Sequence, residues 1–310
     1  IVVEAFKGPD VEKFHLTWED VRRTNPKAVL LSISLLGRSG PTKDWVGWGM
    51  MAGGFIGLNH ASGWPGGRPR QLGGTWPDYS VANLLGFLAL SALRHARRTG
   101  EGQWIDAGMA EAVASTIPER FADYSMNGRD RGPVGNGDDA MAPHGTYPCA
   151  GDDRWIAIAV RNDAEWQAMV RAMGEPAWAT AARFATNTGR LEHEEDLDAG
   201  IATWTSARED YAVMRALQAA GVPAGVCQTP GDRAERDEQL RARGWWHTMP
   251  HAELGEASEF DGVTPRLSLT PGTLRTASPL LGEHTAHVML DILGLSPEEY
   301  AGHEASGVFM

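Results

Sequence analysis

Acidic residues are scarce in one long stretch of this chain. The sequence holds 40 Asp and Glu in 310 residues, yet between Asp44 and Glu101 the only acid is Asp78, where average composition would place about seven. A lone carboxylate in such a stretch is a candidate for chemistry. Asp78 also stands between a Gly/Pro-rich segment and the apolar run from Val81 to Leu93, so we expect it to cap the N-terminus of a helix, which is a common structural role of Asp.

The sequence is also poor in cysteine and in long apolar runs. Cys149 and Cys227 are its only cysteines, and they have neither CxxC nor CxxH spacing, which suits a reducing cytoplasm better than a disulfide scaffold. We interpret both as inert thiols in the core. No apolar run approaches the ~18 residues of a membrane span, and 42% hydrophobic residues over this length predict a globular protein with room for two domains.

Charge is unevenly distributed along the chain. The net charge of −12 argues against nucleic-acid binding. Residues 1–100 carry 12 Lys and Arg against 7 acids, and residues 101–310 carry 16 against 33. The first part could therefore receive a small polyanion, although a random fluctuation of surface charge accounts for the pattern equally well.

Alternating strand and helix patterns predict a parallel α/β sheet in the region 1–130. The apolar strand at 28–36 has the composition of a strand buried on both faces, and the long apolar helix that follows Asp78 is expected to be central to the domain. The expected elements are a strand at 1–6, a helix after Thr17, a strand at 28–36, a helix at 78–98, a strand at 103–106 and a helix at 109–126.

A segment rich in Gly, Asp and Pro at 127–143 indicates a boundary between domains. After it we expect a strand at 155–160, helices around 163–173, 191–205 and 210–220, and a last helix at 283–293. The predicted domains are 1–130 (large domain, first part), 140–224 (small domain) and 225–310 (linker and return to the large domain).

Two motifs resemble binding sites but lack the necessary context. Gly47 to Ala52 spells GxGxxA, yet no apolar strand precedes it and no acid follows about 20 residues later, so we reject a nicotinamide cofactor. His284 and His287 share a helix face without the third ligand that zinc needs, so we expect no metal.

Six short motifs together carry a resemblance that none carries alone. In order they are Asn25-Pro26, Ser32-Ile33-Ser34, Gly40-Pro41, Pro77-Asp78-Tyr79, the run from Arg97 to Asp106, and the run from Pro279 to Thr285. This order and spacing resemble the family III CoA-transferases, also called the CaiB/BaiF family. The resemblance implies a Rossmann-like large α/β domain with a parallel sheet made from both chain ends, an inserted small α/β domain and an interlocked homodimer. Because the chain opens at Ile1 directly in a strand-like run, we also expect that the first ~80 residues of the family have no counterpart here.

The resemblance implies covalent catalysis at Asp78. Its carboxylate would attack the thioester of an acyl-CoA, and coenzyme A would then pass to an acceptor carboxylic acid through an enzyme thioester. The expected partners are an acyl-CoA and a carboxylic acid, with no nucleic acid and no membrane. Coenzyme A thioester is a substrate here, and no permanently bound cofactor is implied.

The same resemblance implies the binding residues. For coenzyme A these are Ala5, Phe6, Lys7, Lys13, Val46 and Trp48. The family usually has Asn at Ala5 and often Arg at Lys7, which puts one hydrogen bond and one bidentate contact in question. A loop containing Gly135, Gly137, Pro143 and His144 is similar to the family's lid over the acyl group. It lacks the four-glycine run of formyl-CoA transferases, so we expect an acyl group larger than formyl or oxalyl.

Two alternatives remain at this stage. An α-methylacyl-CoA racemase moves a proton with a His that precedes its Asp. In an ungapped alignment Trp48 occupies the place of that His, and His60 lies farther along the chain. The chain could also be a catalytically incomplete fragment that only binds coenzyme A.

Overall fold

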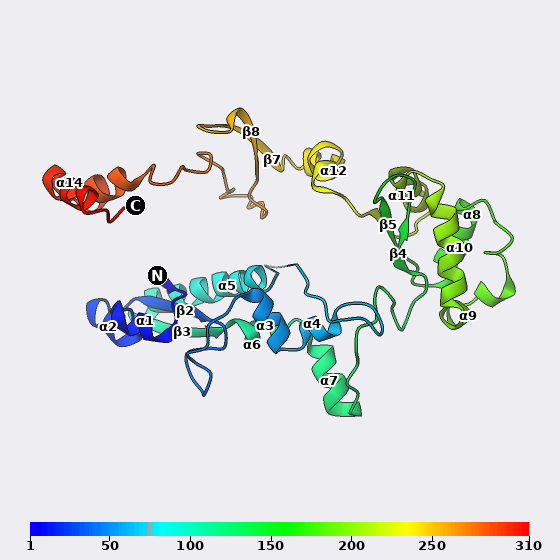
Figure 1. The fold of residues 1–310 in the computed structure, drawn as a ribbon, viewed down its shortest axis with the longest axis horizontal. Helices are drawn as coiled ribbons and strands as arrows, with labels where there is room; N and C mark the ends of the chain where they lie inside the picture. The colour runs from blue at the N-terminus through cyan, green and yellow to red at the C-terminus, as the bar shows by residue number, and fades with distance from the viewer. Residues whose placement is uncertain (74–75, 310) are drawn as a thin grey trace. The chain divides into compact units, whose positions relative to one another are not determined.

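The computed structural model describes residues 1–73 and 76–309. It divides into two compact units, Ile1–Val226 and Cys227–Met310 (Figure 1). The first unit contains two α/β parts, each with its own sheet and its own apolar core. The α/β class expected from the sequence is confirmed.

Parallel pairing organises the first sheet. Its strands are β1 (Val2–Glu4), β2 (Val29–Ser34) and β3 (Gln103–Gly108), with β2 in the middle. The crossover from β1 to β2 contains α1 (Gly8–Lys13) and α2 (Trp18–Thr24). The helix expected after Thr17 is confirmed, and the Thr17 hydroxyl caps it by accepting from the backbone N–H of Asp20 at 3.2 Å.

The long helix α5 (Trp76–Thr99) packs on this sheet beside α3 (Gly49–Phe55), which leads into α4 (Leu58–Ala61). Val81 and Leu85 lie with strand β2 in one apolar cluster. One expectation is wrong. Asp78 does not cap the helix but is its third residue, because the helix begins at Trp76. The side chains of Phe87 and Leu90 on α5 are each 68% exposed.

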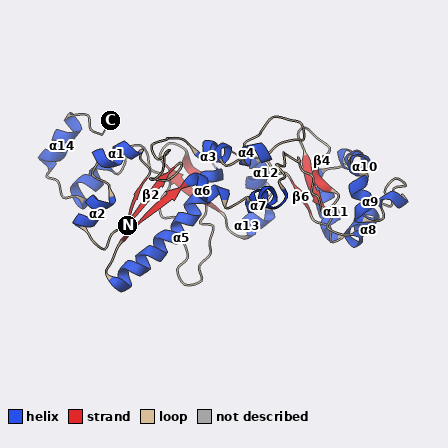
Figure 2. Ribbon diagram, turned by 90° about the horizontal axis from the view of Figure 1, so that it is seen from below, coloured by secondary structure: helices blue, strands red, loops and turns tan. Residues whose placement is uncertain are grey.

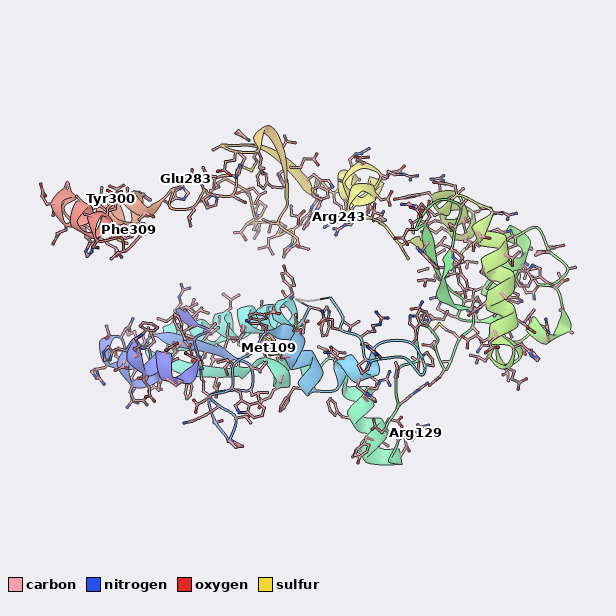
Figure 3. All side chains as sticks on the ribbon, viewed as in Figure 1. Met109, Arg129, Arg243, Glu283, Tyr300 and Phe309 are labelled. Atoms are coloured by element: carbon pink, nitrogen blue, oxygen red, sulfur yellow. The ribbon has the colours of Figure 1, made fainter. Side chains whose placement is uncertain are left out.

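The single helix expected at 109–126 is also wrong. The structure has α6 (Met109–Ala114) and α7 (Pro118–Asn127), because Pro118 has no N–H for the interior of a helix and instead begins a new one. The buried apolar side chains of this part form two clusters, one that includes Val29 and Val81 and a smaller one of Leu35, Ala52 and Ala110. Met109 (Figure 3) packs against both.

An antiparallel sheet forms the second α/β part. Its strands are β4 (His144–Pro148), β5 (Trp155–Ala159) and β6 (Ala224–Val226). Figure 2 shows the helices of this part gathered beside the strands. They are α8 (Asp163–Ala172), the short turn η1 (Ala182–Phe184), α9 (Asn187–Glu192), α10 (Glu194–Ser206) and α11 (Asp210–Ala219). Trp166, Met169 and Phe184 are fully buried in the core.

The second unit contains short elements. They are α12 (Pro230–Glu235), α13 (Glu238–Ala242), the hairpin of β7 (Trp246–His251) and β8 (Gly255–Asp261), the π-helical turn η2 (His287–Ile292) and α14 (Pro297–Ala305). The helix expected at 283–293 is therefore shorter than predicted. Near the end of the chain, the rings of Tyr300 and Phe309 stack with centroids 5.7 Å apart (Figure 3).

The two cysteines have different environments. Cys149 is buried, as expected, whereas Cys227 is exposed, so its prediction as a core thiol is wrong. Within residues 1–73 and 76–309, no helix combines the length and apolar character needed to cross a bilayer.

Candidate active site

Asp78 lies in the first turn of α5 and is exposed. Its carboxylate rests on Gly49, the buried first residue of α3: a Cβ added to Gly49 would lie 1.9 Å from Oδ2 of Asp78 and 3.3 Å from Cβ of Pro77. Glycine at position 49 therefore leaves room for the Asp78 carboxylate in this orientation. The need for glycine at 49 was not apparent from the sequence.

Large aromatic rings next to Gly49 and next to Asp78 in the chain are exposed. Trp48, which precedes Gly49, is 73% exposed, and Tyr79, which follows Asp78, is 69% exposed. Exposed apolar groups that lie close together are typical of binding surfaces, and these two rings flank Gly49 and Asp78, which are in contact. Asp78 therefore lies close in structure or sequence to exposed aromatic side chains, but the described residues do not shield its carboxylate from water.

The predicted coenzyme A segment forms a small cluster at both ends of α1. The rings of Phe6 and Phe14 lie 5.3 Å apart, and the ammonium group of Lys13 lies 5.2 Å from the centre of the Phe14 ring. Lys7 precedes α1 and pairs loosely with Asp10 at 3.7 Å. The structure thus brings Phe6 and Lys13 together through Phe14, a residue that the family motif did not indicate.

The other predicted coenzyme A residues lie on exposed backbone. Ala5 is exposed at the end of β1, and Val46 is 65% exposed in the loop before α3. Among residues 1–73 and 76–309, no hydrogen bond, ion pair or ring contact joins Val46 or Trp48 to Phe6.

A buried ion pair supports the backbone of Phe6. Arg38 Nη2 lies 2.7 Å from Oε2 of Glu4, and their side chains are 8% and 1% exposed. The N–H of Phe6 donates to the same oxygen of Glu4 at 3.0 Å, and its carbonyl accepts from Arg38. The sequence reasoning missed Arg38, because its partner lies 34 positions away.

The predicted substrate loop is fixed at its first glycine. The N–H of Gly135 donates to the carbonyl of Gly63 at 2.9 Å, and a Cβ on Gly135 would lie 2.6 Å from the ring of Trp64. Gly135 also has φ +66°, a conformation that glycine adopts without strain. Gly137 lies near the carboxylate of Glu194.

The other end of the loop is tied to α9. Asn187 donates to the carbonyl of Ala140 at 2.8 Å, and the fully buried Arg190 donates to the carbonyl of Ala142 at 2.7 Å. The carbonyl of Pro143 accepts from Val160 at 2.9 Å. His144 is consequently held at the start of β4.

Asn136 links the loop to β4 through two hydrogen bonds. Its carbonyl oxygen lies 2.6 Å from Nδ1 of His144, and its amide donates to the hydroxyl of Thr146 at 2.7 Å. Because a carbonyl oxygen can only accept, Nδ1 of His144 carries its hydrogen.

A hollow of about 640 Å³ opens beside this loop. Its floor is the face of β4 and β5 that carries Thr146, Ala157 and Ala159, while Tyr147 and Ile156 point into the core. Among its described lining residues, His144 is the only ionisable one: the lining is Gly135–Gly137, His144–Thr146, Ala157–Ala159, Gln218 and Pro223–Gly225.

Three titratable side chains near His144 interact with one another, namely Tyr147, Glu194 and Asp198. The hydroxyl of Tyr147 donates to Asp198 at 2.6 Å. Burial raises the pKa of Asp198 against the lowering effect of that bond. Burial and the charge of Asp198 raise the pKa of Glu194, while His144 pulls it down. Burial, followed by the charge of Asp198, raises the pKa of Tyr147 above its ordinary value.

His60, the residue relevant to a racemase, lies exposed in α4. Within the described ranges it makes no hydrogen bond or ion pair to Asp78. No group of three or more His, Cys, Asp or Glu in those ranges is arranged to hold a metal ion.

Comparison with known proteins settles the family. The model of CoA-transferase family III matches residues 1–285. The chain belongs to this family. Its relatives include the succinyl-CoA–D-citramalate CoA-transferase of Chloroflexus aurantiacus, 32% identical over 99% of this chain and 76% of the relative, and the succinate–glutarate CoA-transferase of Agrobacterium fabrum, 30% identical over 94% and 72%. The protein is therefore a CoA-transferase.

A solved structure agrees with this family III assignment. A CaiB/BaiF family protein from Brucella suis superposes with a TM-score of 0.83 at 27% identity, covering 94% of this chain and 75% of the other. The fold expected from the motifs, a family III CoA-transferase fold, is confirmed.

Proposed function

We propose that this CoA-transferase works by covalent catalysis at Asp78. The carboxylate attacks the thioester carbonyl, the C–S bond breaks, and a mixed anhydride and coenzyme A thiolate result. The thiolate then attacks the aspartyl carbonyl, which releases the donor acid and leaves an enzyme thioester. The acceptor carboxylate repeats these two steps in reverse and restores Asp78. The observation that carries the proposal is the exposed Asp78 carboxylate resting on Gly49.

A hydrated carboxylate is a weak nucleophile, so the site must lose water before the reaction. The exposed rings of Trp48 and Tyr79, with Phe87 and Leu90 farther along α5, offer an apolar surface for this purpose. We propose that substrate and a second copy of the chain cover it in an interlocked homodimer. In that assembly the large domain comprises residues 1–130 and 225–310, and the small domain comprises residues 140–224.

Coenzyme A would bind along the start of the chain. The Phe6 ring is the proposed contact for adenine, and Lys7 and Lys13 are the proposed contacts for phosphates, with Ala5, Val46 and Trp48 completing the site. The clustering of Phe6 with Lys13 supports this arrangement. We also propose that the reaction takes place in the cytoplasm, a reducing compartment that suits two thiols such as Cys149 and Cys227.

The acyl group would lie under the loop of Gly135, Gly137, Pro143 and His144. Two relatives are named for succinyl-CoA with citramalate and for succinate with glutarate, so we propose dicarboxylic acyl groups of this size. The hollow beside the loop is large enough for them, and His144 is its one ionisable residue among those described.

The test is to trap the anhydride. Incubation with succinyl-CoA and hydroxylamine should convert Asp78 to a hydroxamate, detected by mass spectrometry of the peptide. Asp78→Asn should abolish both trapping and transfer, whereas the exposed control Asp152→Asn should change neither. Gly49→Ala should slow trapping because the new methyl group would occupy the place of Oδ2, while Gly54→Ala in the same helix meets only an ordinary contact at 3.4 Å.

Two results would contradict the proposal. The first is exchange of the α-hydrogen of a 2-methylacyl-CoA with deuterated water while Asp78 stays unmodified, as expected of a racemase. The second is binding of coenzyme A with neither reaction, as expected of the incomplete fragment considered above.

A further inference from the structure

The peptide groups of Phe6 are held from both sides by one ion pair. The N–H of Phe6 donates to Oε2 of Glu4 at 3.0 Å, and the carbonyl of Phe6 accepts from Nη2 of Arg38. The same two atoms, Oε2 and Nη2, lie 2.7 Å apart and form the ion pair itself. Phe6 is thus fixed by its backbone, and its ring is left 45% exposed.

The geometry of the pair is not the one that maximises its own strength. An arginine and a carboxylate pair best through two parallel hydrogen bonds. Here Oε1 of Glu4 and Nε of Arg38 are buried without a hydrogen-bond partner in the described residues. Glu4 and Arg38 therefore pair through Oε2 and Nη2, the two atoms that also bond to the backbone of Phe6. They do not make the second hydrogen bond that would strengthen the ion pair itself.

Arg38 is itself held in place by the neighbouring strand. Its backbone N–H lies 2.9 and 3.0 Å from the two carboxylate oxygens of Asp106, which belongs to β3. Glu4 at the end of β1, Arg38 after β2 and Asp106 on β3 therefore form one charged network across three parallel strands. Ligands of open α/β sheets bind beyond such carboxyl ends.

A buried charge pair is costly, and one use that offsets the cost is to enforce a single geometry. We infer that Glu4 and Arg38 are positioning residues that hold the Phe6 ring for the adenine of coenzyme A. This inference rests on the proposed role of Phe6 in the CoA-transferase reaction. Neither residue touches the reacting atoms, so their effect should be confined to binding of the nucleotide end of the substrate.

The experiment compares two thioesters in the Arg38→Gln variant. Succinyl-CoA contains adenine, whereas succinyl-pantetheine has the same thioester without the nucleotide. The KM for succinyl-CoA should rise about tenfold with little change in kcat, and the KM for succinyl-pantetheine should not change. In a Phe6→Ala background, Arg38→Gln should have no further effect, because the ring it positions is gone. The exposed Arg23→Gln is the matched control.

A second variant protects the test against misfolding. Arg38→Met combined with Glu4→Gln leaves no lone buried charge and should show the same selective rise in KM. An equal rise for both thioesters, or no rise for either, would overturn the inference. Hydroxylamine trapping of Asp78 by succinyl-CoA is scored separately: if it fails in the unaltered protein, the proposed function fails, whatever Arg38 does.

Discussion

The two α/β parts of the first unit differ in how completely they bury their apolar side chains. In the part around β4–β6, Trp166, Met169 and Phe184 are fully buried in one continuous core. In the part around β1–β3, a comparable set of large side chains is exposed, including Trp45, Phe55, Phe87 and Leu90. We call the part around β4–β6 the closed part, because its large apolar side chains are buried. We call the part around β1–β3 the open part, because its exposed apolar side chains form a surface of the kind that binds a partner.

The difference bears on the proposed active site. A helix that is apolar all round is normally buried, yet α5 packs only one side on its sheet. The other side of α5 is exposed, and Asp78 lies in the first turn of the same helix. The proposed catalytic residue and the proposed dimer surface are therefore parts of one element.

The largest effect is expected on stability, from a substitution that removes a buried arginine of the closed part. Arg190→Met removes the donors to the carbonyls of Ala142 and Phe184 and the ion pair with Asp163 at 3.0 Å. The free energy of unfolding should fall by about 3 kcal/mol, measured by urea denaturation. Arg183→Met, at an exposed ion pair with Asp196, should cost less than about 1 kcal/mol. Equal losses would show that Arg190 is not needed for the closed core.

Substitution on the open part should leave folding intact but weaken assembly. Phe87→Gln with Leu90→Gln should weaken self-association about a hundredfold, measured by sedimentation equilibrium. The free energy of unfolding of the monomer should change by less than about 0.5 kcal/mol. Trp155→Gln, an exposed ring on β5, should not affect association. An unchanged dimer in the double variant would contradict the assignment of this face.

The smallest expected effect concerns pH and the cluster behind His144. Burial raises the pKa of Asp198 in the folded protein, so its charged form lowers stability as pH rises from the ordinary Asp pKa through the raised value. Asp198→Asn removes this cost and can still accept from Tyr147. At neutral pH the variant should be more stable by up to about 0.5 kcal/mol, given partial exposure, and at pH below the ordinary Asp pKa the gain should vanish.

Asp196→Asn on the same helix is the control for that measurement, since Asp196 is 59% exposed. A gain that persists at low pH, or that the control shares, would mean that burial of the Asp198 charge is not its source.

Local patterns predicted much of the fold. The strand at 28–36 and the helix after Thr17 depend on neighbours in sequence, and the structure confirms both elements. The break at Pro118 is also a local effect, although the predicted helix at 109–126 runs through it. The contact of Gly49 with Asp78 and the support of Phe6 by Arg38 could not be predicted, because they join residues that lie far apart in the sequence.

The central claim is that Asp78 becomes covalently bonded to the acyl group. Its most direct test is turnover with an acceptor acid whose carboxylate carries heavy oxygen. When the acceptor attacks the aspartyl thioester, its oxygen becomes the bridge of the anhydride, and the bridge stays with Asp78 after the thiolate attacks the acceptor carbonyl. The account predicts heavy oxygen in the Asp78 side chain after turnover. Continued transfer of coenzyme A with an unlabelled Asp78 would contradict it.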